Sequence, residues 1–431
     1  MAKIHPFRGI RYNQKIVGDL SQVVTQPYDR IGPKEEEEYL RRSPYNFVRL
    51  IGTKTPPKDE GEYLRRAALF REWLSQGVLI QDERPGFYLY RVRFVHEGKN
   101  YERLGFVALL DLRESQVKKH ERTLRGPKED RLKLFRATEA HLEHIFLLYR
   151  DPERRASQAL RSAVGGRAPD MQAKDDFGNT HEMWHVSDPG AVEEVQAALA
   201  PLPVYIADGH HRFETAGIFM EECFQRGWKP LGPESFTSIP VTLVNVAEPG
   251  CVIRPTPRVV HGLSRFSLGE FLRQVQEDFQ VEELPDFPCA RERLAQALSR
   301  GEKVFVAYSA GKFFALKLRK SPEEVVPGAH APAWKRLDVA ILHKAILEKI
   351  LGIDEETLAR GTHVEYTHTA EEAVALMDEG KGQIAFLLNP TQVEDVLAVA
   401  DAGEPMPQKS TDFYPKLLSG LVAMKMEIAK G

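Results

Sequence analysis

Cysteine is scarce in this chain of 431 residues, which contains only Cys223, Cys251 and Cys289. The three residues are far apart and form no CxxC pair, so the sequence indicates neither a disulfide framework nor a structural zinc site. Cysteine usage of this kind is typical of proteins that work in a reducing compartment.

Long apolar runs are also absent. Nowhere do about eighteen apolar residues follow one another, as a membrane-spanning helix would require. The first twenty residues, MAKIHPFRGIRYNQKIVGDL, lack the apolar segment of a secretion signal. We therefore expect a cytoplasmic location and no membrane partner.

The chain has no large excess of either charge. Its 59 basic and 62 acidic residues give a formal net charge of −3, so no overall field draws it towards nucleic acid. No segment shows a clear helix-turn-helix pattern either. A nucleic-acid partner is not expected on these grounds, although a local basic patch is not excluded.

What the sequence does contain is a mixture of helical and strand patterns along a chain long enough for two or three domains. Apolar residues at helical spacing alternate with β-branched and aromatic runs that enter and leave short turns. Residues 165–188, rich in turn formers, predict a surface excursion or a small hairpin. The predicted helices are 35–40, 60–76, 128–143, 191–202 and 337–352, the predicted hairpins are 86–112 and 302–318, and the predicted strands are 145–149, 204–207 and 383–389.

The fold class expected from these patterns is α+β, in the sense of a mixed α/β protein. Proline becomes more frequent beyond about residue 246, which indicates a change of architecture there. We expect three parts: an N-terminal α+β region over 1–110, a core over 111–245 and a C-terminal α/β domain over 246–431.

The segment VYIADGHHRFETA places polar residues where a predicted strand gives way to a helix near His210 or His211. The amides of about residues 210–213 would be free first-turn donors, which favour phosphate or carboxylate. Gly209 lets an anion approach the backbone, and Arg212 can fork two hydrogen bonds onto phosphate oxygens. Asp208 can cap the helix, orient a histidine or hold Mg²⁺.

Two other interpretations of this segment stay open. In the first, Asp208 is a simple helix cap, the histidines are solvated and Arg212 pairs with Glu214 or another acid. In the second, His210 and Glu214, one helical turn apart, are metal ligands with a distant third partner.

The segment HERTLRGPKEDRL concentrates charge before and within a predicted helix. It is either a charged loop that feeds the helix or part of a reaction site. In the second case Glu121 or His120 is a general acid or base, and Lys128 and Arg131 hold phosphate oxygens. Its charged residues are His120, Glu121, Arg122, Arg125, Lys128, Glu129, Asp130 and Arg131.

Near the carboxyl terminus, MPQKSTDFYPKLLSG offers Lys409, Ser410 and Thr411 as an anion-binding turn. Tyr28 in QPYDRI and Tyr414 are better interpreted as packing residues. His343 and His368 receive no functional role, because isolated histidines in such contexts are usually structural.

Several of these motifs together resemble a bacterial family, domain-of-unknown-function family one thousand and fifteen. ADGHHRFETA is similar to its signature, and the resemblance runs from Gln26 to Leu421 through QPYDRI, SPYNFVRLI, HERTLRGPKEDRL, LDVAILH and MPQKSTDFYPKLLSGL. RPTPRVVHG resembles a family motif that often has histidine where this chain has Pro257, so no catalytic role is expected at that position.

The DGHHR element also resembles the phosphate-binding turn of the ParB and sulfiredoxin superfamily, which includes ADP-dependent free serine kinases. This resemblance covers about residues 115–228 and implies a ParB/sulfiredoxin-like core in which Asp208, Gly209, His210, His211 and Arg212 grip nucleotide or phosphate. In the serine-kinase relatives a glutamate upstream of the turn is the base, which points to Glu121. The long insertion between IFLLY and VYIADG departs from the superfamily pattern.

The function expected from the residues and the resemblance is phosphoryl transfer at a small hydroxy amino acid, with serine or O-phosphoserine as substrate. The same constellation would suit a free serine kinase or a phosphoserine phosphatase, so the direction stays open. ADP or ATP and Mg²⁺ are the candidate cofactors. The alternatives are a ParB-like, nucleotide-responsive DNA-binding protein and a metal-dependent hydrolase.

Overall fold

The computed structural model describes residues 1–121 and 125–430. The chain forms two compact units. Unit 1 comprises Met1–Lys118, Thr123–Cys251 and Pro415–Gly431, and unit 2 comprises Lys119–Arg122 and Val252–Tyr414. Both units combine helices with sheets, which confirms the expected mixed α/β class. The division into 1–110, 111–245 and 246–431 stays a prediction, although strands from the first two parts share one sheet.

The centre of unit 1 is a nine-stranded sheet with the order β6-β11-β8-β13-β5-β4-β10-β9, to which β1 adds by pairing with β5. β8 runs parallel to β13 and antiparallel to β11. The strands are β1 (Ile4–His5), β4 (Phe87–His96), β5 (Lys99–Asp111), β6 (Val117–Lys118), β8 (Ile145–Tyr149), β9 (Met171–Lys174), β10 (Thr180–Val186), β11 (Val204–Asp208) and β13 (Ser238–Asn245).

Burial explains why these segments form central strands. Every residue of β8 and of β13 is buried, as expected for strands covered on both faces. The predicted hairpin at 86–112 is confirmed by β4 and β5, whose turn residues Glu97 and Gly98 have φ values of 48° and 74°.

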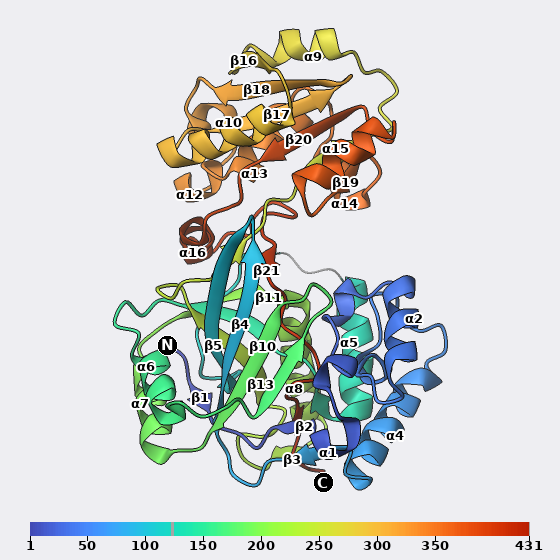
Figure 1. Ribbon diagram of the computed structural model, residues 1–431, viewed down its shortest axis with the longest axis vertical. Coiled ribbons are helices and arrows are strands. Elements are labelled where there is room, and N and C mark those ends of the chain that lie inside the picture. The colour runs from blue at the N-terminus through green and yellow to red at the C-terminus, as the bar shows by residue number, and fades with distance from the viewer. Residues whose placement is uncertain (122–124, 431) are drawn as a thin grey trace. The chain divides into compact units, whose positions relative to one another are not determined.

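Helices flank this sheet. α6 and α7 pack together, and α5 packs against both α4 and α8 (Figure 1). The predictions at 35–40, 60–76 and 191–202 correspond to α2, α4 and α7. The helices of unit 1 are α1 (Gln14–Val17), α2 (Pro33–Arg42), α3 (Val48–Ile51), α4 (Gly61–Ser75), α5 (Arg125–Thr138), α6 (Arg155–Val164), α7 (Pro189–Leu199) and α8 (His210–Gln225), with short 3-10 turns η1 (Leu20–Gln22) and η2 (Tyr28–Arg30).

The carboxyl-terminal segment of unit 1 returns to its amino-terminal part. The amide of Thr25 donates to the carbonyl of Ser419, and the amide of Ile10 donates to that of Ala423. Short strand pairs complete this packing: β22 (Met424–Lys425) with β7 (Ala140–His141), β23 (Ile428–Ala429) with β12 (Lys229–Pro230), and β2 (Ile10–Tyr12) with β3 (Leu79–Gln81).

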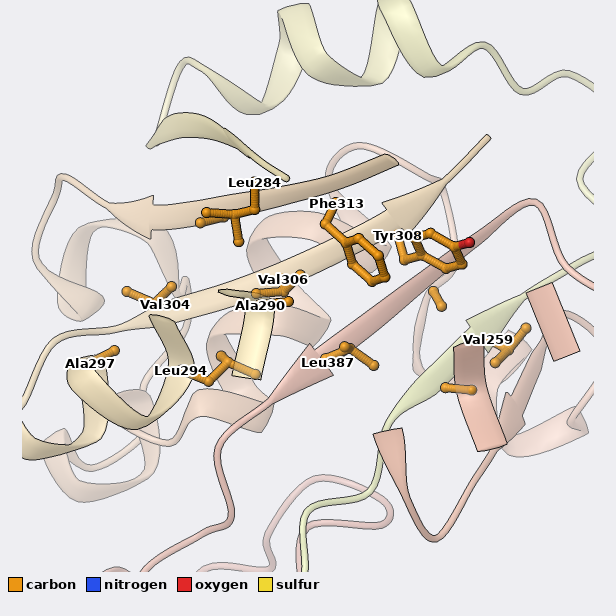
Figure 2. Close-up of a cluster of buried hydrophobic side chains, with 13 residues drawn as sticks. Val259, Leu284, Ala290, Leu294, Ala297, Val304, Val306, Tyr308, Phe313 and Leu387 are labelled. Carbon is orange, nitrogen blue, oxygen red and sulfur yellow. The ribbon is translucent and has the colours of Figure 1, made fainter. Parts of the chain in front are cut away.

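Unit 2 is built on a six-stranded sheet with the order β16-β18-β17-β20-β15-β19. α10 lays Ala290, Leu294 and Ala297 against it, and Figure 2 shows these side chains beside Val304 and Val306. The predicted hairpin at 302–318 and the strand at 383–389 are confirmed. The strands are β15 (Arg258–Val260), β16 (Phe279–Leu284), β17 (Val304–Ser309), β18 (Lys312–Leu318), β19 (Val364–Tyr366) and β20 (Ile384–Leu388), with a separate pair, β14 (Val252–Ile253) and β21 (Phe413–Tyr414).

The helices of unit 2 include one departure from expectation. The predicted helix at 337–352 is α-helical only over α13 (Asp338–Ile341) and continues as the π-helical segment η3 (Leu342–Glu348). The others are α9 (Leu268–Val275), α10 (Phe287–Arg300), α11 (Pro322–Val325), α12 (Pro332–Lys335), α14 (Glu355–Arg360), α15 (Ala370–Asp378) and α16 (Val393–Asp401).

Two further expectations need correction. The helix predicted over 128–143 ends at Thr138, because Ala140 and His141 pair with β22 instead. Residues 165–188 do contain a hairpin, β9–β10, but it is no surface excursion, since β10 is largely buried and pairs with β4 along its whole length. Within the described residues, no helix is both long enough and apolar enough to cross a membrane.

Candidate functional site

The strand-to-helix turn at DGHHR lies where the sequence predicts it. β11 ends at Asp208, Gly209 has a left-handed φ of 94°, and α8 begins at His210. A register shift against β8 between Ile206 and Asp208 bends the strand just before the turn. This confirms the predicted local geometry.

The hydrogen bonds of the turn correct two details of the prediction. The amide of Phe213 is not a free donor, because it donates to the carbonyl of Gly209 over 3.0 Å. Asp208 is not a side-chain cap of α8, because Oδ1 of Asp208 accepts from the amide of Gly209 over 2.9 Å and Gly209 occupies the N-cap position. An α-helix has no intrahelical acceptor for the amides of its first turn, and residues 210–212 occupy that turn in α8.

Glycine is required at position 209 for two reasons. A φ of 94° is a conformation that side-chain-bearing residues rarely adopt. A β-carbon there would also lie 3.1 Å from Nη2 of Arg212 and 3.1 Å from Cδ1 of Ile145. The guanidinium of Arg212 therefore lies against the turn itself, on the side where a β-carbon would project.

Arg212 is buried and held by protein groups. Its Nη1 donates to the carbonyl of His144 over 2.8 Å and lies 3.7 Å from Oε1 of Glu143. Burial by itself lowers the pKa of Arg212, but the nearby carboxylates of Glu143 and Asp208 outweigh burial and raise it. The contacts show Arg212 as a residue that fixes the turn, and its contact with phosphate stays a prediction.

Glu143 connects Arg212 to a second buried arginine. Its Oε1 accepts hydrogen bonds from the amide of Tyr28 (3.1 Å) and from the hydroxyl of Ser419 (3.0 Å), and its Oε2 lies 3.8 Å from Nη1 of Arg131. A cavity of about 10 Å³ touches Glu143, Arg131 and Arg212. That volume has room for about one water molecule.

Arg131, predicted to hold phosphate oxygens, makes internal contacts. Its guanidinium forms two hydrogen bonds to Oδ2 of Asp130, of 2.8 and 2.5 Å, and one of 2.8 Å to the carbonyl of Ile51. It also lies 3.8 Å from the ring centroid of Tyr28. A phosphate-binding role for Arg131 remains a prediction beside this structural one.

Asp208 is surrounded by positive charge. Its Oδ2 lies 3.5 Å from Nζ of Lys416, whose side chain is only 10% exposed. Burial by itself would raise the pKa of Asp208, but the charges of Lys416, Arg212 and Arg30 outweigh burial and lower it to about 2. Asp208 is therefore ionised at neutral pH and too weak a base to accept a proton efficiently.

Lys416 is one residue at this site that sequence reasoning missed. The MPQKSTDFYPKLLSGL motif contains it, but Lys409, Ser410 and Thr411 drew attention because they combine charge with hydroxyls. The available signal was a lysine in a second family-like motif, and pairing it with Asp208 needs three-dimensional information.

The other predicted residues of the turn have distinct surroundings. His210 is buried, with 3% exposure, and His211 is half-buried, with its carbonyl accepting from Thr215 Oγ1 over 2.7 Å. Lys128 on α5 lies 3.2 Å from Oε2 of Glu214. Glu214 thus pairs with Lys128, and Arg212 has Glu143 as its nearest carboxylate.

The remaining predicted residues belong to unit 2. His120 is buried, its carbonyl accepts from the amide of Met406, and its Nε2 lies 3.5 Å from the hydroxyl of Thr411. Glu121 is exposed. Arg122, counted in the same charged segment, lies outside the described residues. That Glu121 and His120 meet the DGHHR turn of unit 1 stays a prediction.

The turn predicted to bind anions uses its own groups internally. The carbonyl of Lys409 accepts from Nη2 of Arg258 over 2.9 Å, and the carbonyl of Ser410 accepts from the hydroxyl of Thr391 over 2.7 Å. The Ser410 hydroxyl donates to the carbonyl of Pro407 over 2.5 Å. Anion binding by Lys409 and Ser410 stays a prediction.

Comparison with solved structures finds distant likeness. A free serine kinase in complex with AMP is 16% identical, with 74% of this chain and 91% of that chain covered and a TM-score of 0.36. A conserved hypothetical protein from Pyrococcus furiosus is 15% identical, with 73% and 95% covered and a TM-score of 0.33. C-terminally truncated SbnI from Staphylococcus aureus is 10% identical, with 73% and 85% covered and a TM-score of 0.36.

No curated protein matches the chain. One family model does match, over residues 4–340, a range that includes the DGHHR turn, Glu143 and the strands β15 to β18 of unit 2. Because the match covers well over half of the sequence, it identifies the family. The chain belongs to the family described as "Protein of unknown function (DUF1015)".

Proposed function

We propose that this protein catalyses phosphoryl transfer at serine or O-phosphoserine, with the phosphoryl group bound at the start of α8. One observation carries the proposal: the positive charges of Lys416, Arg212 and Arg30 act on a single carboxylate, that of Asp208, beside the first turn of a helix. Positive charge beside a helix start favours an anionic ligand, because it adds to the positive end of the helix dipole.

The roles of the residues follow from their contacts. Arg212 is committed to His144 and Glu143 and holds the turn, so Lys416 is the better candidate for a direct phosphate contact. The positive end of the α8 dipole would also stabilise the phosphate oxygens. Asp208, ionised at neutral pH, would keep Lys416 in place or hold Mg²⁺ beside the phosphate.

The reaction needs one proton-transfer group besides these electrostatic ones. In the synthetic direction, the serine hydroxyl oxygen attacks the terminal phosphorus of ADP or ATP, the bond to the bridging oxygen breaks, and AMP or ADP leaves. The hydroxyl proton goes to a base, for which Glu121 is our first candidate and His120 or His210 the others. In the hydrolytic direction water attacks O-phosphoserine, and serine and phosphate leave.

A direct assay tests this proposal. The purified protein is incubated with L-serine plus ADP or ATP, and separately with O-phosphoserine, with and without Mg²⁺, while nucleotides, phosphate and O-phosphoserine are measured. We expect turnover in at least one mixture. Absence of turnover in all of them, together with tight binding of duplex DNA, would favour the ParB-like alternative and end the enzyme proposal.

A variant pair locates the activity. Lys416→Ala should raise KM for the phosphorylated reactant by about tenfold, because a charge-assisted contact to phosphate is lost. Lys425→Ala, an exposed lysine in the same carboxyl-terminal segment, is the control and should leave KM unchanged. Equal KM values for the two variants would show that the phosphate does not bind beside Lys416.

A further inference from the structure

Arg258 in unit 2 is a buried cation without a counter-ion. It has no exposed surface, yet within the described part of the chain it forms no ion pair with any carboxylate. Its Nη1 donates to the carbonyl of Thr256 and its Nη2 to that of Lys409, 2.9 Å away. Arg131 and Arg212, by contrast, each lie within ion-pair distance of carboxylates. Burying a charge without a counter-ion costs free energy of desolvation, so a negatively charged ligand next to Arg258 would stabilise the protein.

Besides Nε of Arg258, two polar groups near it, on His343 and Tyr366, lack hydrogen-bond partners among the described residues. Nε of Arg258, Nε2 of His343 and the hydroxyl of Tyr366 are all buried, and none has a hydrogen-bond partner among the residues that the structure describes. Tyr366 pairs with Arg258 across β19 and β15, and the guanidinium lies 5.4 Å from its ring centroid. Burial lowers the pKa of His343, on η3, and the charge of Arg258 lowers it further, so the imidazole lies within reach of that charge.

The three groups can all donate hydrogen bonds, His343 in the tautomer that carries its proton on Nε2. A water molecule accepts two hydrogen bonds at most and leaves the charge of Arg258 uncompensated. An oxyanion has several acceptor oxygens and a negative charge, so it can accept from all three groups and also compensate the charge of Arg258. The π-helical form of η3, which carries His343, is a form often found at functional sites.

We propose that unit 2 contains a second anion site, in which Arg258, His343 and Tyr366 bind a small oxyanion, either a phosphate group or a carboxylate. The three residues belong to unit 2 and α8 belongs to unit 1, and the inference does not depend on the proposed function. Because Arg258 also holds the carbonyl of Lys409, whose φ is 56°, an anion bound there would stabilise the turn at Lys409 and Ser410.

The test is a titration of the full-length protein by calorimetry, with phosphate, acetate and L-serine as probes at ionic strength matched with sodium chloride. Lys416→Ala serves as the background, so that binding at α8 is weakened. We expect one saturable site for phosphate or for the carboxylates, and the arm that saturates assigns the class of anion. If neither phosphate nor the carboxylates give a saturable signal beyond that of sodium chloride alone, the proposal is overturned.

Variants place the anion in the site. Tyr366→Phe removes only a hydroxyl and should weaken binding at least about fivefold. Tyr308→Phe, on β17 of the same sheet, is the matched control, because the Tyr308 hydroxyl donates to Asp378 of α15, and this variant should leave affinity within about twofold. Equal affinities of the two variants overturn the proposal. Arg258→Met should abolish binding, and the milder Tyr366→Phe decides the matter if that variant does not fold.

A spectroscopic signal gives independent evidence. The imidazole nitrogen resonances of His343 should shift on saturation with the anion, because Nε2 gains a partner. Unchanged His343 resonances in a protein that binds the anion would place the ligand elsewhere and contradict the assignment.

Discussion

At the scale of the residue, Glu143 is the group on which the site depends most. It accepts two hydrogen bonds and lies within 3.8 Å of the guanidinium groups of both Arg131 and Arg212. Sequence reasoning found Arg131 and Arg212 because charged motifs stand out, but it missed Glu143, which lies in the apolar context HLEHIFLLY. Its hydroxyl partner Ser419 is 276 positions away, and no local pattern relates residues so distant.

Arg212→Ala should therefore destabilise unit 1 as well as affect any phosphate binding. Removing one partner from a buried ionic network leaves the other charge uncompensated, so we expect a loss of about 3 kcal/mol in the free energy of unfolding. Urea denaturation measures it. Arg136→Ala, which breaks the surface ion pair with Glu222, should cost below about 1 kcal/mol. Similar losses for both would mean that the network contributes little.

The low pKa of Asp208 predicts how stability depends on pH. Because the folded-state pKa, about 2, lies below the unfolded value of about 3.9, the stabilisation by Asp208 is complete above about pH 4. It is lost as the pH falls towards 2. Asp208→Asn should thus cost about 2 kcal/mol between pH 5 and 8 and progressively less in acid. Chemical denaturation of both proteins across this range checks it, and a cost that grows in acid would contradict it.

At the scale of the element, sequence patterns predicted what local forces determine. The β4–β5 hairpin, the strand β8 and the junction of β11 with α8 follow from alternation, turn residues and glycine. The sequence patterns failed where pairing with a distant segment determines which secondary structure a stretch adopts. β10 joins the central sheet through β4, and α5 ends early because residues 140–141 pair with β22. A π-helix such as η3 keeps the amphipathic pattern of an α-helix, so periodicity could not distinguish them.

The junction itself can be tested with two glycines of the same helical segment. Gly209→Ala should destabilise the protein by about 1–3 kcal/mol, because position 209 has positive φ and its added methyl would press on Arg212 and Ile145. Gly217→Ala, inside α8 where a β-carbon meets nothing within 4 Å, should stabilise by about 0.5–1 kcal/mol. Thermal unfolding compares them, and effects of the same sign would argue against the strained turn.

At the scale of the whole molecule, the predicted site draws on both units. Asp208 and Arg212 belong to unit 1, whereas His120, Glu121, Lys409 and Ser410 belong to unit 2. Sequence motifs suggested one site because the motifs occur together in a family, which indicates shared importance without placing residues in space. The DGHHR turn has the expected local geometry. That the residues of unit 2 act together with this turn stays a prediction.

The variant Glu121→Gln tests whether Glu121 acts as the base in a reaction at the DGHHR turn. If Glu121 accepts the substrate proton, kcat should fall at least about a hundredfold with little change in KM, since the loss affects the transition state alone. Steady-state kinetics with serine and nucleotide, or with O-phosphoserine, measures it. Glu129→Gln, an exposed glutamate of the same charged motif on α5, is the control. Wild-type kinetics for Glu121→Gln would remove Glu121 from the mechanism.

The return of residues 415–430 to unit 1 has a consequence for biosynthesis. A ribosome delivers the chain from its amino terminus, so the first 251 residues emerge long before the segment that supplies Ser419, Val422 and Lys416. Val252–Tyr414 is nearly all of unit 2 and can condense during translation, because domains generally fold as units. Unit 1 is complete only after residues 415–430 have also left the exit tunnel, and until then Glu143 lacks the hydroxyl of Ser419 and Asp208 lacks the ammonium group of Lys416.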